Sequence, residues 1–115
     1  MARQSPLPNL DDKEKQAISE LTSSINSKWP SAKFILFGSK ARGTWDSESD
    51  TDLLVILPCA VSDESRRLII REVFDLNLNY GSNISIMIVS DAEWTSGPLS
   101  LLPIHDSILE EGIPV

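Results

Sequence analysis

The stretch GSKARGTWDSESDTDLLVIL, residues 38–57, decides the fold that the sequence predicts. It follows one apolar run, KFILF at Lys33–Phe37, and it ends in another, DLLVIL at Asp52–Leu57. Short apolar runs bounded by polar and glycine-containing segments are typical of buried strands. We therefore expect two strands whose connection carries Gly38-Ser39 at its start and Asp50-x-Asp52 at its end.

The aspartates at positions 50 and 52 are one residue apart. In an extended chain such residues share a face and stand about 6–7 Å apart. A carboxylate pair of this kind suits Mg²⁺, which takes one or two carboxylates together with substrate phosphates. Asp52 heads an apolar strand, where a carboxylate without a partner is costly, so a metal is its best partner. For Asp50, solvation in a polar loop is the simpler alternative.

Gly38-Ser39 leaves the first strand at the point where a short helical turn is expected. Free backbone N–H groups and a hydroxyl at such a turn can bind a phosphate. A serine that merely caps the turn is the alternative, and the nearby aspartates favour phosphate binding. Arg42 is the natural second phosphate ligand, because its guanidinium matches phosphate oxygens in pairs. A surface ion pair with acids of the same loop remains open for Arg42. The predicted phosphate-binding turn and the carboxylate pair together suggest that the protein catalyses phosphoryl or nucleotidyl transfer.

With ten residues between Ser39 and Asp50, the stretch resembles the signature of minimal nucleotidyltransferases, small members of the DNA polymerase β superfamily. Ala41-Arg42-Gly43 after the serine and the apolar strand Leu53–Leu57 after the aspartates also match that family. The resemblance extends from about Pro8 to Val115. It implies an α/β (α+β) domain of the polymerase β palm type, with a small mixed sheet, helices packed on one face and the carboxylates lining the other.

The resemblance also implies a function and a site. Gly38, Ser39 and Arg42 would bind the phosphates of a nucleoside triphosphate, and Asp50 and Asp52 would be the catalytic, Mg²⁺-binding residues. AMP from ATP would pass to an acceptor hydroxyl. Stand-alone domains of this size in the family often act as antitoxins that modify a small helical HEPN-type partner protein.

The chain departs from the family at the third carboxylate, which normally lies on the following strand. That strand is expected at Ile84–Val89, which contains no acid, and the position that aligns is Ser85. Asp91, Glu93 and Asp75 fit the role poorly. Either the alignment is shifted, another group substitutes, or the chain binds nucleotide with little turnover. A binding module that neutralises or scaffolds a partner protein is therefore the second functional hypothesis.

The size and the net charge of the chain indicate which kinds of molecule it binds. We expect a flexible lead at residues 1–8 and one domain at 9–115. The net charge of −7 disfavours nucleic acid, whose binding draws on Lys and Arg, and favours a small nucleotide and a protein acceptor. A small-molecule transferase would normally need a further substrate-binding domain. The lone Cys59 and the lack of a long apolar run predict a cytoplasmic protein without a membrane span. A homo-oligomer is left open.

The remaining segments complete the expected order, α–β–(short α)–β–α–β–α. A first helix has a capping box at Asp11 and Glu14 and an apolar stripe that ends at Trp29. A second helix is expected at about Asp63–Asn79, with Gly81 as its cap. The charged residues of this helix are expected to form a solvated face. One last helix is expected between Leu99 and Glu111, with His105 on its surface, and an extended piece at 113–115.

Overall fold

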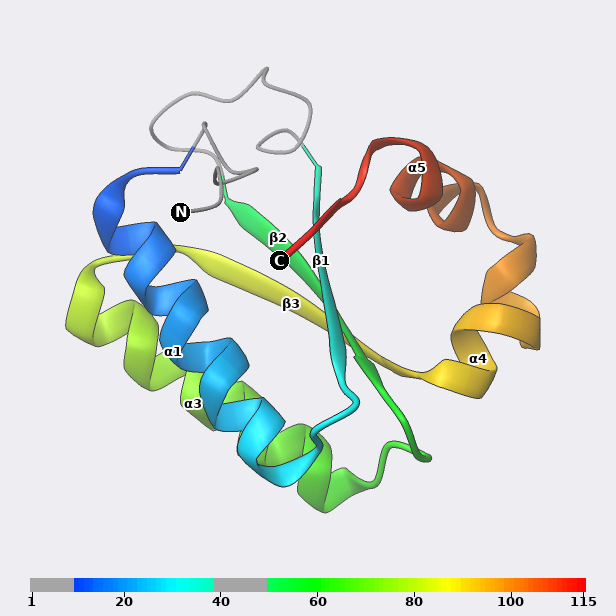
Figure 1. Cartoon of the computed structure of the whole chain (residues 1–115), viewed down its shortest axis with the longest axis horizontal. Helices are drawn as coiled ribbons and strands as arrows, with labels where there is room; N and C mark the ends of the chain where they lie inside the picture. Colours follow the sequence, from blue (N-terminus) through cyan, green and yellow to red (C-terminus); the bar gives the residue numbers. More distant parts are fainter. Residues whose placement is uncertain (1–9, 39–49) are drawn as a thin grey trace, which may run out of the picture.

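A four-stranded mixed sheet forms the centre of the molecule (Figure 1), as the sequence predicts. The computed structural model describes residues 10–38 and 50–115, so the expected lead at 1–8, turn at 39–42 and loop at 43–49 lie outside it. The strand order is β3–β2–β1–β4, with β1 antiparallel to β2 and β4, and β2 parallel to β3. The strands are β1 (Lys33–Phe37), β2 (Thr51–Leu57), β3 (Ile84–Ser90) and β4 (Ile113–Pro114).

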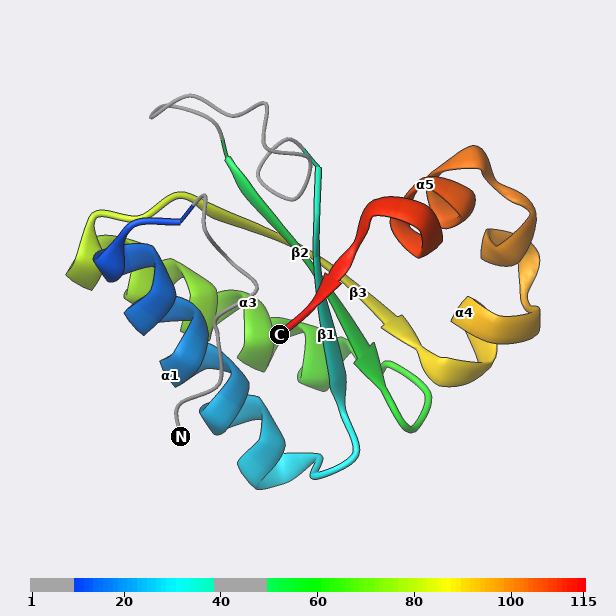
Figure 2. The ribbon, with the colours of Figure 1, turned by 45° about the horizontal axis from the view of Figure 1, so that its top comes forward.

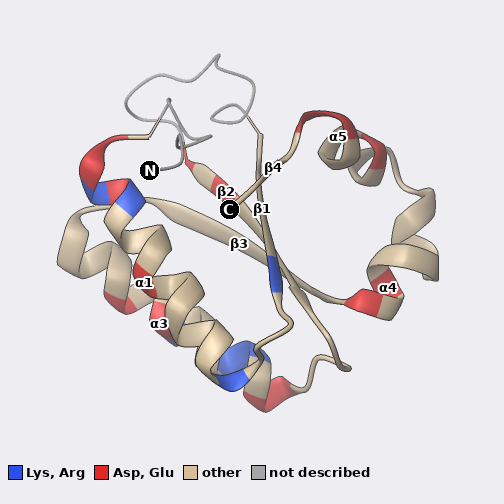
Figure 3. Ribbon diagram, in the orientation of Figure 1, with Lys and Arg blue, Asp and Glu red and all other residues tan. Residues whose placement is uncertain are grey.

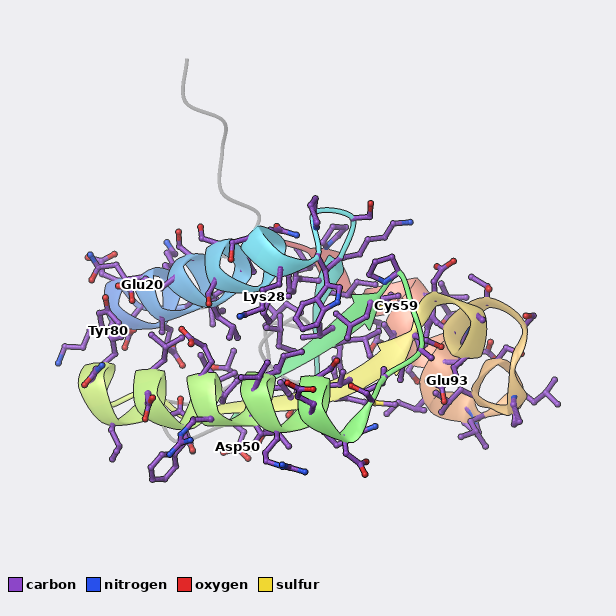
Figure 4. The ribbon with its side chains drawn as sticks, turned by 90° about the horizontal axis from the view of Figure 1, so that it is seen from below. Glu20, Lys28, Asp50, Cys59, Tyr80 and Glu93 are labelled. Carbon is purple, nitrogen blue, oxygen red and sulfur yellow. The ribbon has the colours of Figure 1, made fainter. Side chains whose placement is uncertain are left out.

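Two long helices, α1 (Asp12–Lys28) and α3 (Asp63–Tyr80), cover one face of the sheet (Figure 2). The predicted capping box begins α1, and Gly81, with φ +64°, ends α3. The helices lie side by side, and the hydroxyl of Tyr80 on α3 donates a hydrogen bond to Glu20 on α1 (Figure 4). The main core lies between these helices and the sheet; its most buried members include Leu21, Leu36, Leu53, Val55, Leu57 and Ile69.

A second helical layer covers part of the opposite face. It consists of α4 (Asp91–Ser96), a 3₁₀ turn η1 (Pro98–Leu101) and α5 (Pro103–Glu111). The last helix expected between Leu99 and Glu111 is confirmed as α5, whereas α4 and η1 were not expected. Ser90 and Glu93 form a capping box that starts α4 directly after β3, and the chain then turns at Gly97. A smaller core lies under this layer, made of Leu54, Ile56, Val89, Trp94 and Ile108.

His105 does not lie on the surface, contrary to the sequence expectation. Its side chain is only 12% exposed, and its ring packs against Trp94 with centroids 4.2 Å apart. Nε2 lies 2.9 Å from the carbonyl oxygen of Trp94, so this nitrogen is the donor. The reason is the α4–α5 turn, which folds α5 back over Trp94. None of the helices in the described ranges combines the length and the apolarity that a bilayer span requires.

Candidate active site

The predicted carboxylate pair lies at the beginning of β2, on the face that α1 and α3 leave free. Alternation along the strand decides this, because Leu53 belongs to the main core whereas Leu54 belongs to the smaller core on the opposite face. Asp52 therefore points to the same side as Leu54. The acidic start of β2 is visible next to the segment that is not described (Figure 3).

Gly38 and Asp52 are in direct contact across the β1–β2 pair. Phe37 is the register partner of Asp52, so Gly38 follows directly beside the carboxylate. A Cβ atom built on Gly38 would lie 2.3 Å from Asp52 Oδ2, and the backbone at this position has φ +81°. Only glycine tolerates both conditions without strain. The structure thus brings Gly38, where the predicted phosphate-binding turn begins, next to Asp52 of the carboxylate motif.

Asp50 is held by two neutral donors from the chain around the start of β3. Asn83 Nδ2 lies 2.6 Å from Asp50 Oδ1, and Ser85 Oγ lies 3.4 Å from Asp50 Oδ2. The backbone N–H of Thr51 also donates to the carbonyl of Asn83, at 2.9 Å. Sequence reasoning missed Asn83, because its place beside Asp50 depends on the parallel register of β2 and β3.

Ser85 occupies the place where the third carboxylate was sought. In the parallel β2–β3 pair its register partner is Asp52. Asp91 begins α4 at the other end of β3, and Asp75 lies on α3, beneath the opposite face of the sheet. Within residues 10–38 and 50–115, no group of three or more His, Cys, Asp or Glu side chains is placed to hold a metal ion.

The start of β2 is also fixed from the helix side of the sheet. Thr51, fully buried, donates from its hydroxyl to Glu14 Oε2 at 2.7 Å. Glu14 is 9% exposed and completes the capping box of α1 as well. Glu14, a residue of the predicted capping box, therefore positions Thr51, which lies between the two aspartates. The capping box identified Glu14, but nothing local in the sequence pairs it with Thr51.

The described residues fit a magnesium ion. Asp52 at the start of β2 and Asp50 just before it supply two carboxylates at one strand start, and Asp52 lies against the backbone of Gly38. Hard oxygen ligands in this number are what Mg²⁺ takes when substrate phosphates supply further ligands. Ser39 and Arg42, the other two predicted nucleotide ligands, lie outside the described residues.

Comparison with known proteins identifies the family of the chain. The family model described as "Nucleotidyltransferase domain" matches residues 18–115. A Methanocaldococcus jannaschii protein named "Putative protein adenylyltransferase" is 33% identical over 107 residues, which cover 86% of this chain and 94% of that protein.

Two solved structures share the fold. One is the "Structure of putative minimal nucleotidyltransferase"; it matches with a TM-score of 0.55 and 24% identity, over 94% of this chain and 99% of that chain. The other is a toxin–antitoxin crystal structure with AMP-PNP, with a TM-score of 0.58 and 17% identity, over 90% and 72% of the two chains. The family match, supported by a shared fold and by a carboxylate pair at the start of β2, leads to one conclusion: the chain belongs to the nucleotidyltransferase domain family.

Proposed function

We propose that the protein is a Mg²⁺-dependent nucleotidyltransferase that moves AMP from ATP onto a hydroxyl group of a partner protein: the hydroxyl oxygen bonds to the α-phosphorus and loses its proton, and pyrophosphate leaves. The observation that carries this proposal is the contact between Gly38 and the Asp52 carboxylate. The contact supports the proposal because Gly38 begins the predicted phosphate-binding turn and Asp52 belongs to the predicted metal-binding pair. A nucleotide whose phosphates lie over Gly38 would therefore have its charged oxygens beside the carboxylate pair.

Each residue then has a separate task. Gly38, Ser39 and Arg42 bind the β- and γ-phosphates, with the guanidinium of Arg42 matching two phosphate oxygens. Asp50 and Asp52 hold the magnesium ion, which neutralises phosphate charge when it is bound. Asn83 and Ser85 orient Asp50 through its two oxygens. The protein's contribution is mainly positioning and charge stabilisation, as in phosphoryl transfer generally.

Three observations support ATP as donor and a protein as acceptor. The archaeal relative is named as a protein adenylyltransferase, and one structural neighbour is a toxin–antitoxin structure with AMP-PNP. The net charge of −7 disfavours a nucleic-acid acceptor. We infer a HEPN-type toxin as the acceptor, modified on a hydroxyl side chain such as tyrosine, with this chain as the antitoxin.

Thermal melting with and without Mg-ATP tests the nucleotide site. Binding at a hundredfold excess over Kd stabilises a folded protein by about 2.7 kcal/mol. We expect this shift in the wild type and its loss in Asp50→Asn/Asp52→Asn, which keeps the shape of both side chains. A wild type that does not shift at millimolar Mg-ATP contradicts the proposal.

Co-expression with the product of the neighbouring gene, followed by intact-mass measurement, tests the transfer itself. The enzyme hypothesis predicts a mass increase of one or more AMP units on the partner. The carboxylate-dead variant is the control and should leave the partner unmodified.

Ser85 in the third-carboxylate position favours a second candidate function. A chain with a weakened metal site would neutralise its partner by binding alone, and AMP transfer would be slow or absent. A stable complex with an unmodified partner, formed equally by the wild type and by Asp50→Asn/Asp52→Asn, would identify this function.

A further inference from the structure

The turn from α3 into β3 carries Asn83, the donor to Asp50, and both chain neighbours of Asn83 are bound to Asn77. Asn77 Oδ1 accepts from the Ser82 hydroxyl at 2.8 Å and from the Ile84 N–H at 2.9 Å. Asn77 Nδ2 donates to the Ile84 carbonyl at 3.1 Å. The backbone carbonyl of Asn77 also accepts the N–H of Ser82, at 3.2 Å. One residue of α3 therefore fixes the segment that reaches the candidate metal site.

An asparagine suits position 77 because Ile84 begins an edge strand. Among the described strands, β2 is the only neighbour of β3, so the outer side of β3 has no strand to pair with. The carbonyl of Asn83 accepts from Thr51 on β2, so the backbone groups of the next residue, Ile84, point outward. A carboxamide carries an acceptor and a donor side by side. Asn77 therefore pairs with both backbone groups of Ile84 as a neighbouring strand would.

The hydrogen bond from Asn83 to Asp50 depends on this support, because both side chains are exposed. Water competes with a hydrogen bond at an exposed position, and ordering a free side chain costs conformational entropy. A donor whose backbone is already fixed loses less of that entropy. Asn83 is also neutral, so it orients Asp50 without cancelling the charge that a metal ion would need.

We propose that Asn77 is a positioning residue of the candidate active site. Through Ser82 and Ile84 it holds Asn83, and Asn83 holds Asp50 in the orientation in which Asp50 binds Mg²⁺. The proposal rests on the proposed function and adds to it a residue outside the nucleotide motif. Residues that orient a metal ligand typically change metal affinity by about 10–100-fold when they are removed. Asn77 acts through one further residue, so we expect the lower end of this range.

Asn77→Ala tests the proposal, with Val73→Ala as the matched control. Val73 is buried on the same helix, one turn before Asn77, and its side chain forms no hydrogen bonds. Both variants should melt at a lower temperature than the wild type without ligand. We expect Asn77→Ala alone to raise the Mg²⁺ concentration that gives half of the melting shift at constant ATP, by about 10-fold. Val73→Ala should leave this Mg²⁺ midpoint unchanged.

A double-mutant cycle with Asn83→Ala tests whether Asn77 acts through Asn83. Asn83→Ala should itself raise the Mg²⁺ midpoint by about 10-fold or more. Adding Asn77→Ala to it should raise the midpoint no further. Effects that multiply would mean that Asn77 supports the site by a route other than Asn83, and they would overturn the proposal.

Amide hydrogen exchange without Mg²⁺ and ATP gives a readout that does not depend on the nucleotide site. The N–H of Thr51 donates to the carbonyl of Asn83 at 2.9 Å, so its exchange reports on the position of the turn. Asn77→Ala should speed exchange at Thr51 more than at Val55 in the middle of β2. Val73→Ala should speed the two amides equally, because it lowers global stability only.

Ser82→Ala removes one of the hydrogen bonds to Asn77 and serves if Asn77→Ala does not fold. It should raise the Mg²⁺ midpoint in the same direction by a smaller factor. An unchanged midpoint in the variant that folds, or an equal rise in Val73→Ala, would overturn the positioning role. Absence of the Mg-ATP shift in the wild type would instead overturn the nucleotide site, and exchange at Thr51 would still decide whether Asn77 holds the turn.

Discussion

The carboxylate of Asp52 lies where a side chain at position 38 would have to be. A Cβ atom on Gly38 would come within 2.3 Å of Asp52 Oδ2. The glycine of the motif is therefore required for two reasons, its left-handed backbone and the proximity of the Asp52 carboxylate. The two reasons can be separated experimentally, because Gly81 has a similar backbone conformation but no side chain close to the position of an added Cβ atom.

Gly38→Ala and Gly81→Ala form that comparison. Gly81 has φ +64°, and a Cβ atom added to it would have no heavy atom within 4 Å outside its chain neighbours. We expect both variants to lose about 1–2 kcal/mol of unfolding free energy from the left-handed backbone. Only Gly38→Ala should also displace Asp52 and lose the Mg-ATP melting shift. A Gly38→Ala protein that keeps the shift would show that the contact has no part in nucleotide binding.

Ser85→Asp should restore a third carboxylate beside Asp50 and Asp52. Without metal, we expect the variant to melt at a lower temperature than the wild type, since like charges repel at close range. With Mg-ATP its melting shift should be larger than that of the wild type. Nucleotidyl transfer, measured with labelled ATP, should rise about 10-fold or more, toward the 100-fold typical of a positioned general base.

Ser85→Asn is the neutral control for that substitution, because asparagine has nearly the shape of aspartate without its charge. It should neither enlarge the Mg-ATP melting shift nor raise the transfer rate. If Ser85→Asp instead slows transfer, another residue completes the site, and the alignment of Ser85 with the third carboxylate is wrong.

Thr51→Val tests the buried link between α1 and the start of β2. The substitution removes the hydroxyl that donates to Glu14 at 2.7 Å. We expect the unfolding free energy to fall by about 1–3 kcal/mol, because the buried carboxylate of Glu14 loses one of its hydrogen-bond donors. Thr51→Ser keeps the hydroxyl and should lose less. Chemical denaturation compares the two variants; equal stabilities would show that the hydrogen bond contributes nothing.

Tyr80 gives the fold a dependence on alkaline pH. Its hydrogen bond to Glu20 raises the pKa of the phenol above its ordinary value of 10.0, with smaller contributions from burial and from the Glu20 charge. Because the folded-state pKa is raised, this stabilisation is complete below pH 10.0 and is lost as the pH rises through the folded-state pKa. Denaturation midpoints of the wild type and Tyr80→Phe should therefore converge at high pH.

Tyrosinate absorbance offers a direct check, because Tyr80 is the only tyrosine in the chain. In the native protein it should titrate at higher pH than in denaturant. Glu20→Gln should return the native titration toward the ordinary value. A native titration that coincides with the denatured one would contradict the raised pKa.

The sequence predicted those parts of the fold that local patterns specify. Lys33–Phe37 is a strand with these bounds, and Gly81 ends α3, because apolar runs and cap glycines act within a few residues. The mixed sheet and the family followed from the spacing of Gly38-Ser39 and Asp50-x-Asp52. α4 was missed because its six residues are too few for apolar periodicity to show.

The candidate site was predictable only in part, because register brings its supporting residues together. Asp52 lies on the face of the sheet opposite α1 and α3, and its register partner on β3 is Ser85. Asn83 and Glu14 bond to the start of β2 across 33 and 37 residues of chain, and no local pattern predicts such contacts. The roles of Gly38, Ser39, Arg42, Asp50 and Asp52 in nucleotide and metal binding stay predictions.

Those two long-range bonds have a consequence for how the candidate site forms. Asp50 is steadied by a segment that follows α3, and Thr51 by the first turn of α1, so the site needs three distant parts of the chain at once. Each closure costs loop entropy that is recovered only when the sheet pairs. During synthesis, a chain released before Asn83 would contain the whole nucleotide motif but lack the support of Asp50. We therefore expect nucleotide binding only after the chain has folded completely, and we expect an incomplete chain not to bind nucleotide.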